Sequence, residues 1–178
     1  MPALIPFEEI VHLFGEFEHT AFRLETRRGY ATDRDGSRYQ AFMRGVMPDI
    51  EPDHPWNANV RTKADQGARF SRVRIIDTPP TDGQRFLMAT AEGGVAAGED
   101  IRVLTRAEAE RLELPDYDLW LFDSRTLVRM HVDESDTTIG VELITDQGWV
   151  LAACKARDAA TAAARPSAEV WAQVRSTV

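Results

Sequence analysis

The chain has 178 residues, of which 43% are apolar and 28% charged. This is the composition of an ordinary globular protein that is long enough to bury a core as a single domain. The 21 Lys and Arg against 29 Asp and Glu leave a net charge of −8, which argues against broad adhesion to nucleic acid or anionic lipid. The sequence has no long apolar run for a membrane span and no secretory signal. A single cysteine, Cys154, cannot form an internal disulfide, so we expect a cytoplasmic protein.

The charge is unevenly distributed along the chain. From His19 to Arg74 there are eleven Lys and Arg but only seven Asp and Glu, whereas the remaining residues together carry −12. If these Lys and Arg side chains lay close together in the folded protein, they would form a basic face on an otherwise acidic protein. We favour the alternative, a solvated surface, because dispersed charges usually face water.

Hydrophobic periodicity and turn residues predict the elements of the first half of the chain. Apolar residues return at helical spacing after Pro6, and the alternation after His19 is that of a half-buried strand. Ser37 and Gln40 have the spacing of a capping box. In chain order the prediction is a helix at 6–15, a strand at 20–26, a helix at 37–45, a loop at 47–55 and a helix at 56–68.

The second half is predicted in the same way. A strand at 71–77 should stop at Pro79-Pro80, because consecutive prolines cannot continue a hydrogen-bonded ladder. Capping-box spacing predicts helices after Thr81 and Thr105. The prediction is a helix at 84–92, a strand at 101–104, a helix at 105–112, strands at 118–122, 127–132 and 138–144, and helices at 145–164 and from 166 onward.

These elements predict an α+β protein with a mainly antiparallel sheet, flanked by several short helices. The three strands between 118 and 144 are separated by short, turn-rich intervals, so we expect them to form an antiparallel meander. We expect one domain over 1–178, with 150–178 as a helical C-terminal extension packed on it.

Nucleotide and metal sites of the common kinds are not predicted. Gly93 to Gly98 has the glycine spacing of a phosphate-binding loop, but Glu99 and Asp100 follow where Lys and Ser or Thr are needed. We expect a flexible turn there. The four histidines are scattered without a ligand motif, and we expect neither a metal nor a cofactor.

No catalytic constellation stands out, but several residues are candidates. His131 lies in a predicted strand on the face opposite Met130, where it could serve as a general base, although a structural histidine is the favoured interpretation. The acids at predicted strand ends could pair as acid and base or, as we favour, make local caps and ion pairs: Glu99, Asp100, Asp118 and Asp123. Trp120 lies in an all-apolar strand, which favours the core over a stacking platform.

Several segments together resemble one known family. They are Glu18–Glu25, Arg72–Ile76, Ala97–Arg102, Leu114-Pro115, Asp118–Asp123 and Met130-His131. In these the chain resembles the uncharacterised actinobacterial family DUF6879, from about Phe7 to Trp149. The resemblance implies a small cytoplasmic protein, often encoded beside helix-turn-helix regulators, with no established activity. The chain departs from the family pattern after residue 150, where alanines replace an aromatic and arginine-rich tail.

Two functional hypotheses follow. The first is a regulatory or interaction protein that binds a partner, such as a neighbouring helix-turn-helix regulator, through the basic segment 19–74 or a sheet edge. The second is a small enzyme or ligand-binding protein with a polar cleft for an anionic small molecule, in which His131 is the candidate base. The predicted binding residues are Arg23, Arg72, Arg74, Glu99, Asp100, Arg102, Trp120, Asp123 and His131.

Overall fold

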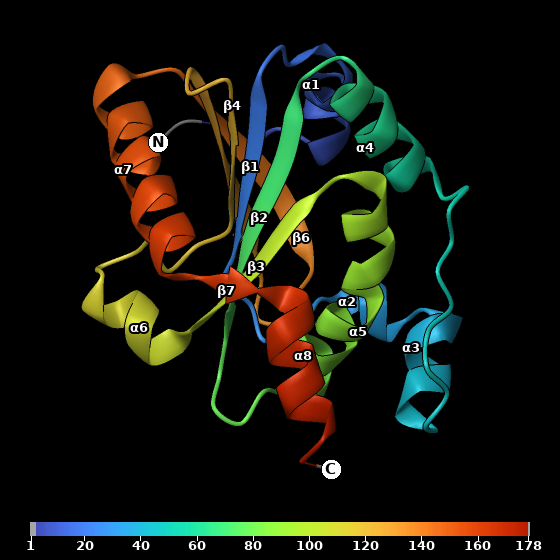
Figure 1. Cartoon of the computed structure of the whole chain (residues 1–178). Helices are drawn as coiled ribbons and strands as arrows, with labels where there is room; N and C mark the ends of the chain where they lie inside the picture. The colour runs from blue at the N-terminus through green and yellow to red at the C-terminus, as the bar shows by residue number, and fades with distance from the viewer. Residues whose placement is uncertain (1–2, 178) are drawn as a thin grey trace.

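The computed structural model of the chain describes residues 3–177, which form one seven-stranded sheet with helices on both faces. Figure 1 shows α6 and α7 on one side of the sheet and α1, α4 and α5 on the other. The strand order is β6-β5-β4-β1-β2-β3-β7. The strands are β1 (Thr20–Glu25), β2 (Arg69–Ile76), β3 (Asp100–Thr105), β4 (Leu119–Phe122), β5 (Thr126–Val132), β6 (Thr138–Ile144) and β7 (Arg165–Pro166).

The sheet is mixed, and the prediction of a mainly antiparallel sheet was wrong. β1, β2 and β3 are parallel, whereas β4 pairs antiparallel with β1, β5 with β4, β6 with β5, and β7 with β3. The parallel part arises because helices connect β1 to β2 and β2 to β3, and a chain that crosses over through helices returns in the same direction. The sequence pattern predicted helices between β1 and β2, but strand direction depends on which strands become neighbours in space, and the pattern does not show that.

The helices match the predicted positions with several differences. They are η1 (Phe7–Ile10), α1 (Leu13–Glu16), α2 (Ala31–Arg34), α3 (Ser37–Met43), α4 (Pro55–Asp65), α5 (Asp82–Ala97), α6 (Arg106–Arg111), α7 (Gln147–Ala163) and α8 (Ser167–Arg175). The capping boxes at Thr81 and Thr105 are both formed. Ser37 is not a cap, because α3 begins at that residue and no side chain caps it. The helix α2 and the strand β7 were not predicted.

The glycines between 93 and 98 do not form the expected flexible turn. Gly93 and Gly94 lie inside α5, and only Gly98 leaves the helix, as a left-handed C-cap with φ of 112°. A Cβ on Gly94 would lie 2.8 Å from Glu99 Oε2. Glycine is therefore required at 94 by the close approach of the next strand rather than by a turn.

The core lies on both faces of the sheet. On one face α6 and α7 pack on Phe22, Leu24 and their neighbours. On the other face, one cluster gathers under α1 and α4 around Phe14, Phe70 and Trp120, and another gathers where α5 and α8 meet, around Trp171. Between these two clusters the same face carries charged residues. Within residues 3–177, no helix is long and apolar enough to cross a membrane.

Candidate binding cavity

Charged side chains form two rows across the middle of the sheet. Alternate residues of a strand point to the same face, so Arg23 and Glu25 of β1 lie on one face of the sheet. The register places Arg23 beside Arg72 and Glu25 beside Arg74 of the parallel strand β2. These four residues come from segments about fifty positions apart, and strand pairing alone brings them together.

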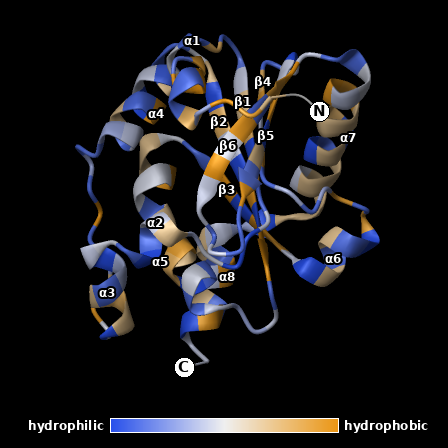
Figure 2. Cartoon of the chain, turned by 180° about the vertical axis from the view of Figure 1, so that it is seen from behind, coloured by the Kyte–Doolittle hydropathy of each residue, from blue (hydrophilic) through white to orange (hydrophobic). Residues whose placement is uncertain are grey.

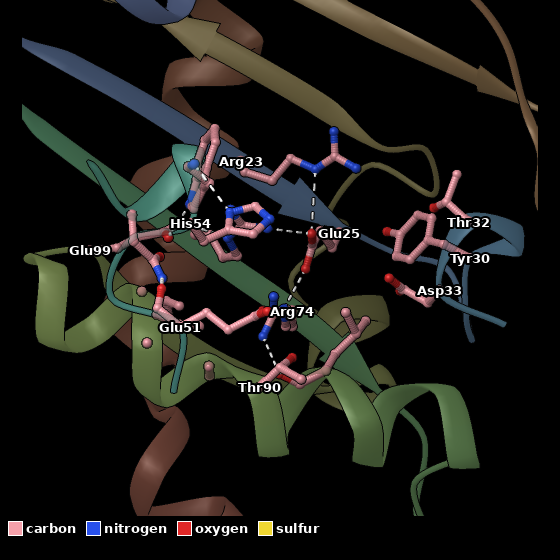
Figure 3. Close-up of a pocket in the computed structure, with 18 of the residues that line it drawn as sticks. Arg23, Glu25, Tyr30, Thr32, Asp33, Glu51, His54, Arg74, Thr90 and Glu99 are labelled. Atoms are coloured by element: carbon pink, nitrogen blue, oxygen red, sulfur yellow. Dashed lines mark hydrogen bonds and ion pairs between the residues drawn. The ribbon is translucent and has the colours of Figure 1, made fainter. Parts of the chain in front are cut away.

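Glu25 is the centre of this network. Its Oε1 accepts a hydrogen bond from Arg72 Nη1 at 2.7 Å, and its Oε2 accepts one from Arg74 Nε at 2.5 Å. Arg23 Nε lies 3.7 Å from Oε1, too far for a hydrogen bond. Figure 3 shows Glu25 between Arg23 and Arg74. One buried carboxylate thus holds two guanidinium groups and is close to a third.

Two further carboxylates complete the network. Glu99 accepts from Arg72 Nε at 2.7 Å and from the indole of Trp56 at 3.0 Å. Asp118, only 1% exposed, accepts from Arg23 Nη2 at 2.9 Å. It also accepts from the hydroxyl of Tyr30 at 2.5 Å and from the backbone and hydroxyl of Thr26. Three arginines are therefore balanced by three carboxylates.

The environment keeps Glu25 charged. Burial by itself raises the pKa of Glu25, but the charges of Arg74, Arg72 and Arg23 outweigh it and lower the pKa to about 2. Burial raises the pKa of Tyr30 well above its usual value, and the negative charges of Glu25 and Asp118 add to this effect. Tyr30 is therefore a neutral donor to Asp118 at physiological pH.

The charged rows form the floor of a cavity of about 720 Å³. Its walls come from α4 and α5, and α2 and the connection between α3 and α4 surround its mouth. Figure 3 shows Tyr30, Thr32 and Asp33 on one side of Glu25 and His54 and Glu99 on the other. Such a volume is typical of small-molecule sites.

At the floor, the Nη2 groups of two arginines are accessible and have no hydrogen-bond partner among the described residues. Arg74 is 7% exposed, and its Nη1 donates a hydrogen bond to the carbonyl of Leu87 at 2.6 Å. The Nε and Nη1 of Arg72 donate to Glu99 and Glu25. The Nη2 of each makes no hydrogen bond with any described residue, and neither atom is fully enclosed. Arg72 also lies over Trp56 and Trp120, 5.5 and 5.7 Å from their ring centres, which fixes its position.

The structure brings together five of the nine predicted binding residues. Those that line the cavity are Arg23, Arg72, Arg74, Glu99 and Trp120. Trp120 is also buried in the aromatic cluster, where it was expected. Asp100, Arg102, Asp123 and His131 are not part of the lining.

The four residues outside the cavity have local partners. Asp123 accepts from the backbone N–H groups of Glu18, His19 and Thr20 at 2.7–3.0 Å, so it ties the turn after β4 to the start of β1. Asp100 pairs with Arg102 at 3.0 Å near the surface.

His131 lies on the other face of the sheet, because its neighbour Met130 lines the cavity and strand residues alternate. Its Nε2 lies 3.3 Å from Glu142. The candidate base is therefore separated from the arginines by the sheet itself.

Sequence reasoning missed Glu25 and Tyr30 and gave Trp56 no role in the site. A signal for Glu25 was present, because Arg23-Leu24-Glu25 and Arg72-Val73-Arg74 place charges on one face of two predicted strands. Such a face was taken to be solvated. It is buried because α4 and α5 cover it.

The arginines of segment 19–74 are largely taken up by ion pairs. Arg27 and Arg34 pair with Asp136 at 2.6 and 2.8 Å, and Arg38 pairs with Glu51 at 2.5 Å. Most of these arginines thus pair with acids, Arg27 and Arg34 with Asp136 outside the segment and Arg38 with Glu51 inside it, rather than forming a free basic face. Within residues 3–177, no three His, Cys, Asp or Glu side chains are grouped so as to hold a metal.

Comparison with known proteins identifies a family but no activity. The family model described as "Domain of unknown function (DUF6879)" matches residues 8–172. No curated protein matches the chain.

Two solved structures are similar to the chain. NucT from Helicobacter pylori is similar over 93% of this chain and 97% of its own, with a TM-score of 0.53 at 8% identity. TrmBL2, an archaeal chromatin protein described as having a novel mode of DNA binding, is similar over 89% of this chain, with a TM-score of 0.49 at 9% identity. The chain spans about half the length of TrmBL2. At these identities the likeness to NucT concerns the fold alone.

Proposed function

Since the chain belongs to the DUF6879 family, whose description assigns no function, we propose from its geometry that it is a small-molecule-binding protein. The ligand occupies the cavity of about 720 Å³ and presents a carboxylate or another hydrogen-bond acceptor to Arg72 and Arg74. The single cysteine supports a cytoplasmic setting for this activity.

One observation carries the proposal: a fully charged network lies beneath a cavity and leaves two donors unused. Burying charges costs stability, and apolar residues of similar volume would often serve the fold as well or better. Buried charged groups with shifted pKa values gather at functional sites more often than elsewhere. The free Nη2 groups of Arg72 and Arg74 then supply directional contacts that an acceptor on the ligand could fill.

The proposal concerns binding rather than catalysis. The candidate base His131 lies on the opposite face of the sheet from the arginines. Glu25 is held as an ion by its arginines, which makes it a poor proton acceptor near neutral pH.

A substitution that fills the cavity tests this proposal without breaking an ion pair. Thr90 lines the cavity from α5, so Thr90→Phe should occupy the ligand volume. Val95 lies on the same helix, is 45% exposed and is outside the lining, so Val95→Phe is the matched control.

A thermal-shift screen of small carboxylates, phosphates and polar metabolites should find ligands that stabilise the native protein. Thr90→Phe should reduce their affinity at least about tenfold, whereas Val95→Phe should leave it unchanged. A screen without any stabilising compound, or equal losses in both variants, would contradict the proposal.

We also propose, as a second function, contact with a protein partner such as a helix-turn-helix regulator. The supporting observation is a run of exposed apolar side chains in and after α3: Met43, Val46, Met47 and Ile50, each 47–57% exposed. Figure 2 shows hydrophobic colour in this outer connection between α3 and α4. Contiguous exposed apolar residues often mark interaction sites.

A pull-down with helix-turn-helix regulators as bait tests this second function. Substituting Val46→Asp and Met47→Asp together should abolish retention, because charge would be placed in the apolar contact. Ile139→Asp, an equally apolar and exposed position on the distant edge strand β6, is the control. Retention that is unaffected by the double substitution would exclude this surface.

A further inference from the structure

The polar groups of the cavity that have no hydrogen-bond partner within residues 3–177 differ between its floor and its rim: donors lie at the floor and carboxylates at the rim. On the floor every carboxylate oxygen of Glu25, Glu99 and Asp118 accepts a hydrogen bond. The groups there without a hydrogen-bond partner among the described residues are all donors: Arg72 Nη2 and Arg74 Nη2, which are accessible, and Arg23 Nε, which is enclosed. A ligand therefore meets donors at the floor and no free acceptor among these three acids.

The rim shows the opposite arrangement. Asp33 of α2, Asp49 in the connection between α3 and α4, and Glu92 of α5 all line the cavity. Over residues 3–177 the carboxylates of these three acids make no hydrogen bond and no ion pair. The outer part of the cavity thus offers three carboxylates that have no hydrogen-bond or ion-pair partner in the described part of the chain.

This separation disfavours a ligand that is only an anion. The lining as a whole has four arginines against six acids, whereas the floor arginines are balanced by Glu25, Glu99 and Asp118. A simple anion would reach the floor through a negative rim, which opposes it. A ligand with a cationic group at its outer end would instead be attracted at both ends.

Asp33 is the rim acid best placed to bind a cation. It is half-buried, and Figure 3 shows it beside Tyr30, to one side of Glu25. Burial, and then the negative charge of Glu25, raise the pKa of Asp33. An ammonium group beside Asp33 would relieve this repulsion and gain an ion pair partly protected from water.

We propose that the ligand is a zwitterion of the amino-acid or short-peptide class, with its carboxylate on Arg72 and Arg74 and its amino group on Asp33. This inference rests on the proposed small-molecule function and specifies its ligand. The volume of about 720 Å³ leaves room for a side chain. Apolar lining residues that could contact that side chain are Phe7, Val11, Phe14, Ile50 and Trp56.

The test uses matched probes with the full-length protein. A panel of L-amino acids and dipeptides is titrated by calorimetry at pH 7, each beside its N-acetylated form and its C-amidated form. Acetylation removes the positive charge and amidation removes the negative charge. The zwitterion should bind at least about fivefold more tightly than either modified form, because each modification deletes one of the two ion pairs.

Asp33→Asn links this preference to the rim. The variant should lose about fivefold in affinity for the zwitterion and nothing for the acetylated form. Asp35→Asn is the matched control, since Asp35 is an exposed neighbour at the end of α2 that does not line the cavity. Circular dichroism of both variants checks that they are folded.

The outcomes separate this inference from the proposed function. Equal binding of the zwitterion and the acetylated form, or no effect of Asp33→Asn, would overturn the zwitterion while leaving the cavity a binding site. Binding of simple carboxylates or phosphates alone would have the same meaning. If no anion and no zwitterion binds at millimolar concentration, both proposals fail.

Discussion

Glu25 shows how a single residue can hold a site together. It bridges Arg72 and Arg74, which both lie on β2 and would otherwise repel each other in a buried environment. Removing one partner of a buried ion pair is costly, because the charge left behind loses both water and its counter-charge. We therefore expect this carboxylate to stabilise the fold as well as to position the floor donors.

Glu25→Gln should lower the free energy of unfolding by about 3–5 kcal/mol at pH 7, because the buried Arg74 loses its carboxylate partner and Arg72 keeps only Glu99. Urea denaturation measures the change. Asp100→Asn is the control, since its ion pair with Arg102 is half-exposed and should contribute less than about 1 kcal/mol. Similar losses in the two variants would show that burial does not matter here.

The contribution of Glu25 should depend on pH in a defined direction. Its pKa is about 2 in the folded protein, against 4.5 for an unperturbed glutamate. A lowered pKa means that the stabilisation is fully present above pH 4.5 and is lost as the pH falls toward 2. The difference in unfolding free energy between the native protein and Glu25→Gln should therefore shrink between these values in urea titrations. A constant difference would contradict the assignment.

At the scale of elements, sequence signals for helix caps were reliable where both hydrogen-bonding partners lie within a few residues of each other. The capping boxes at Thr81 and Thr105 formed as predicted, because Gln84 and Glu108 lie only three residues away. The same spacing failed at Ser37, where the helix begins one residue too early for the hydroxyl to accept from the third helical N–H. The chain conformation before a helix decides whether a capping sequence caps.

This contrast can be measured directly. Thr105→Ala removes a hydroxyl that accepts from Glu108 N–H, and should cost about 1 kcal/mol of unfolding free energy. Ser37→Ala removes the same group at a position where it caps nothing, and should change stability by less than about 0.5 kcal/mol. Chemical denaturation of the two variants in parallel is sufficient, and an equal loss would mean that Ser37 also caps its helix.

At the scale of the whole molecule, the C-terminal segment is part of the core. Val150, Ala153 and Ala160 of α7 pack on one face of the sheet, while β7 pairs with β3 and forms the edge of the sheet. Trp171 of α8 then packs with Ile76, Met88 and Val103 next to the charged rows. The last thirty residues thus close both faces of the sheet.

Trp171→Ala should lower the unfolding free energy by about 3–5 kcal/mol, because it leaves a cavity between α5, α8 and β3. Trp149→Ala is the matched control, since Trp149 is on α7 and 50% exposed. Thermal denaturation should show a large fall in Tm for the first variant and little change for the second. Equal behaviour would mean that α8 is not part of the core.

The sequence predicted which charged residues share one face of a strand, but it did not predict which face of the sheet the cavity occupies. The arginines Arg23, Arg72 and Arg74 were chosen from the sequence and do line the cavity. His131 was chosen because it lies in a strand, but the alternation that places Met130 toward the cavity places His131 away from it. The sequence could order residues along a strand but could not tell which face a cavity occupies.

The sequence by itself determined the elements and the charged stripes on β1 and β2, because periodicity and capping act over a few residues. Only the tertiary structure decided the strand directions, the burial of those stripes and the pairing of Arg23 with Asp118 across 95 positions. These features depend on contacts between distant segments. Burial of apolar side chains on both faces of the sheet supplies the favourable free energy, and ion pairing offsets the cost of burying the charges.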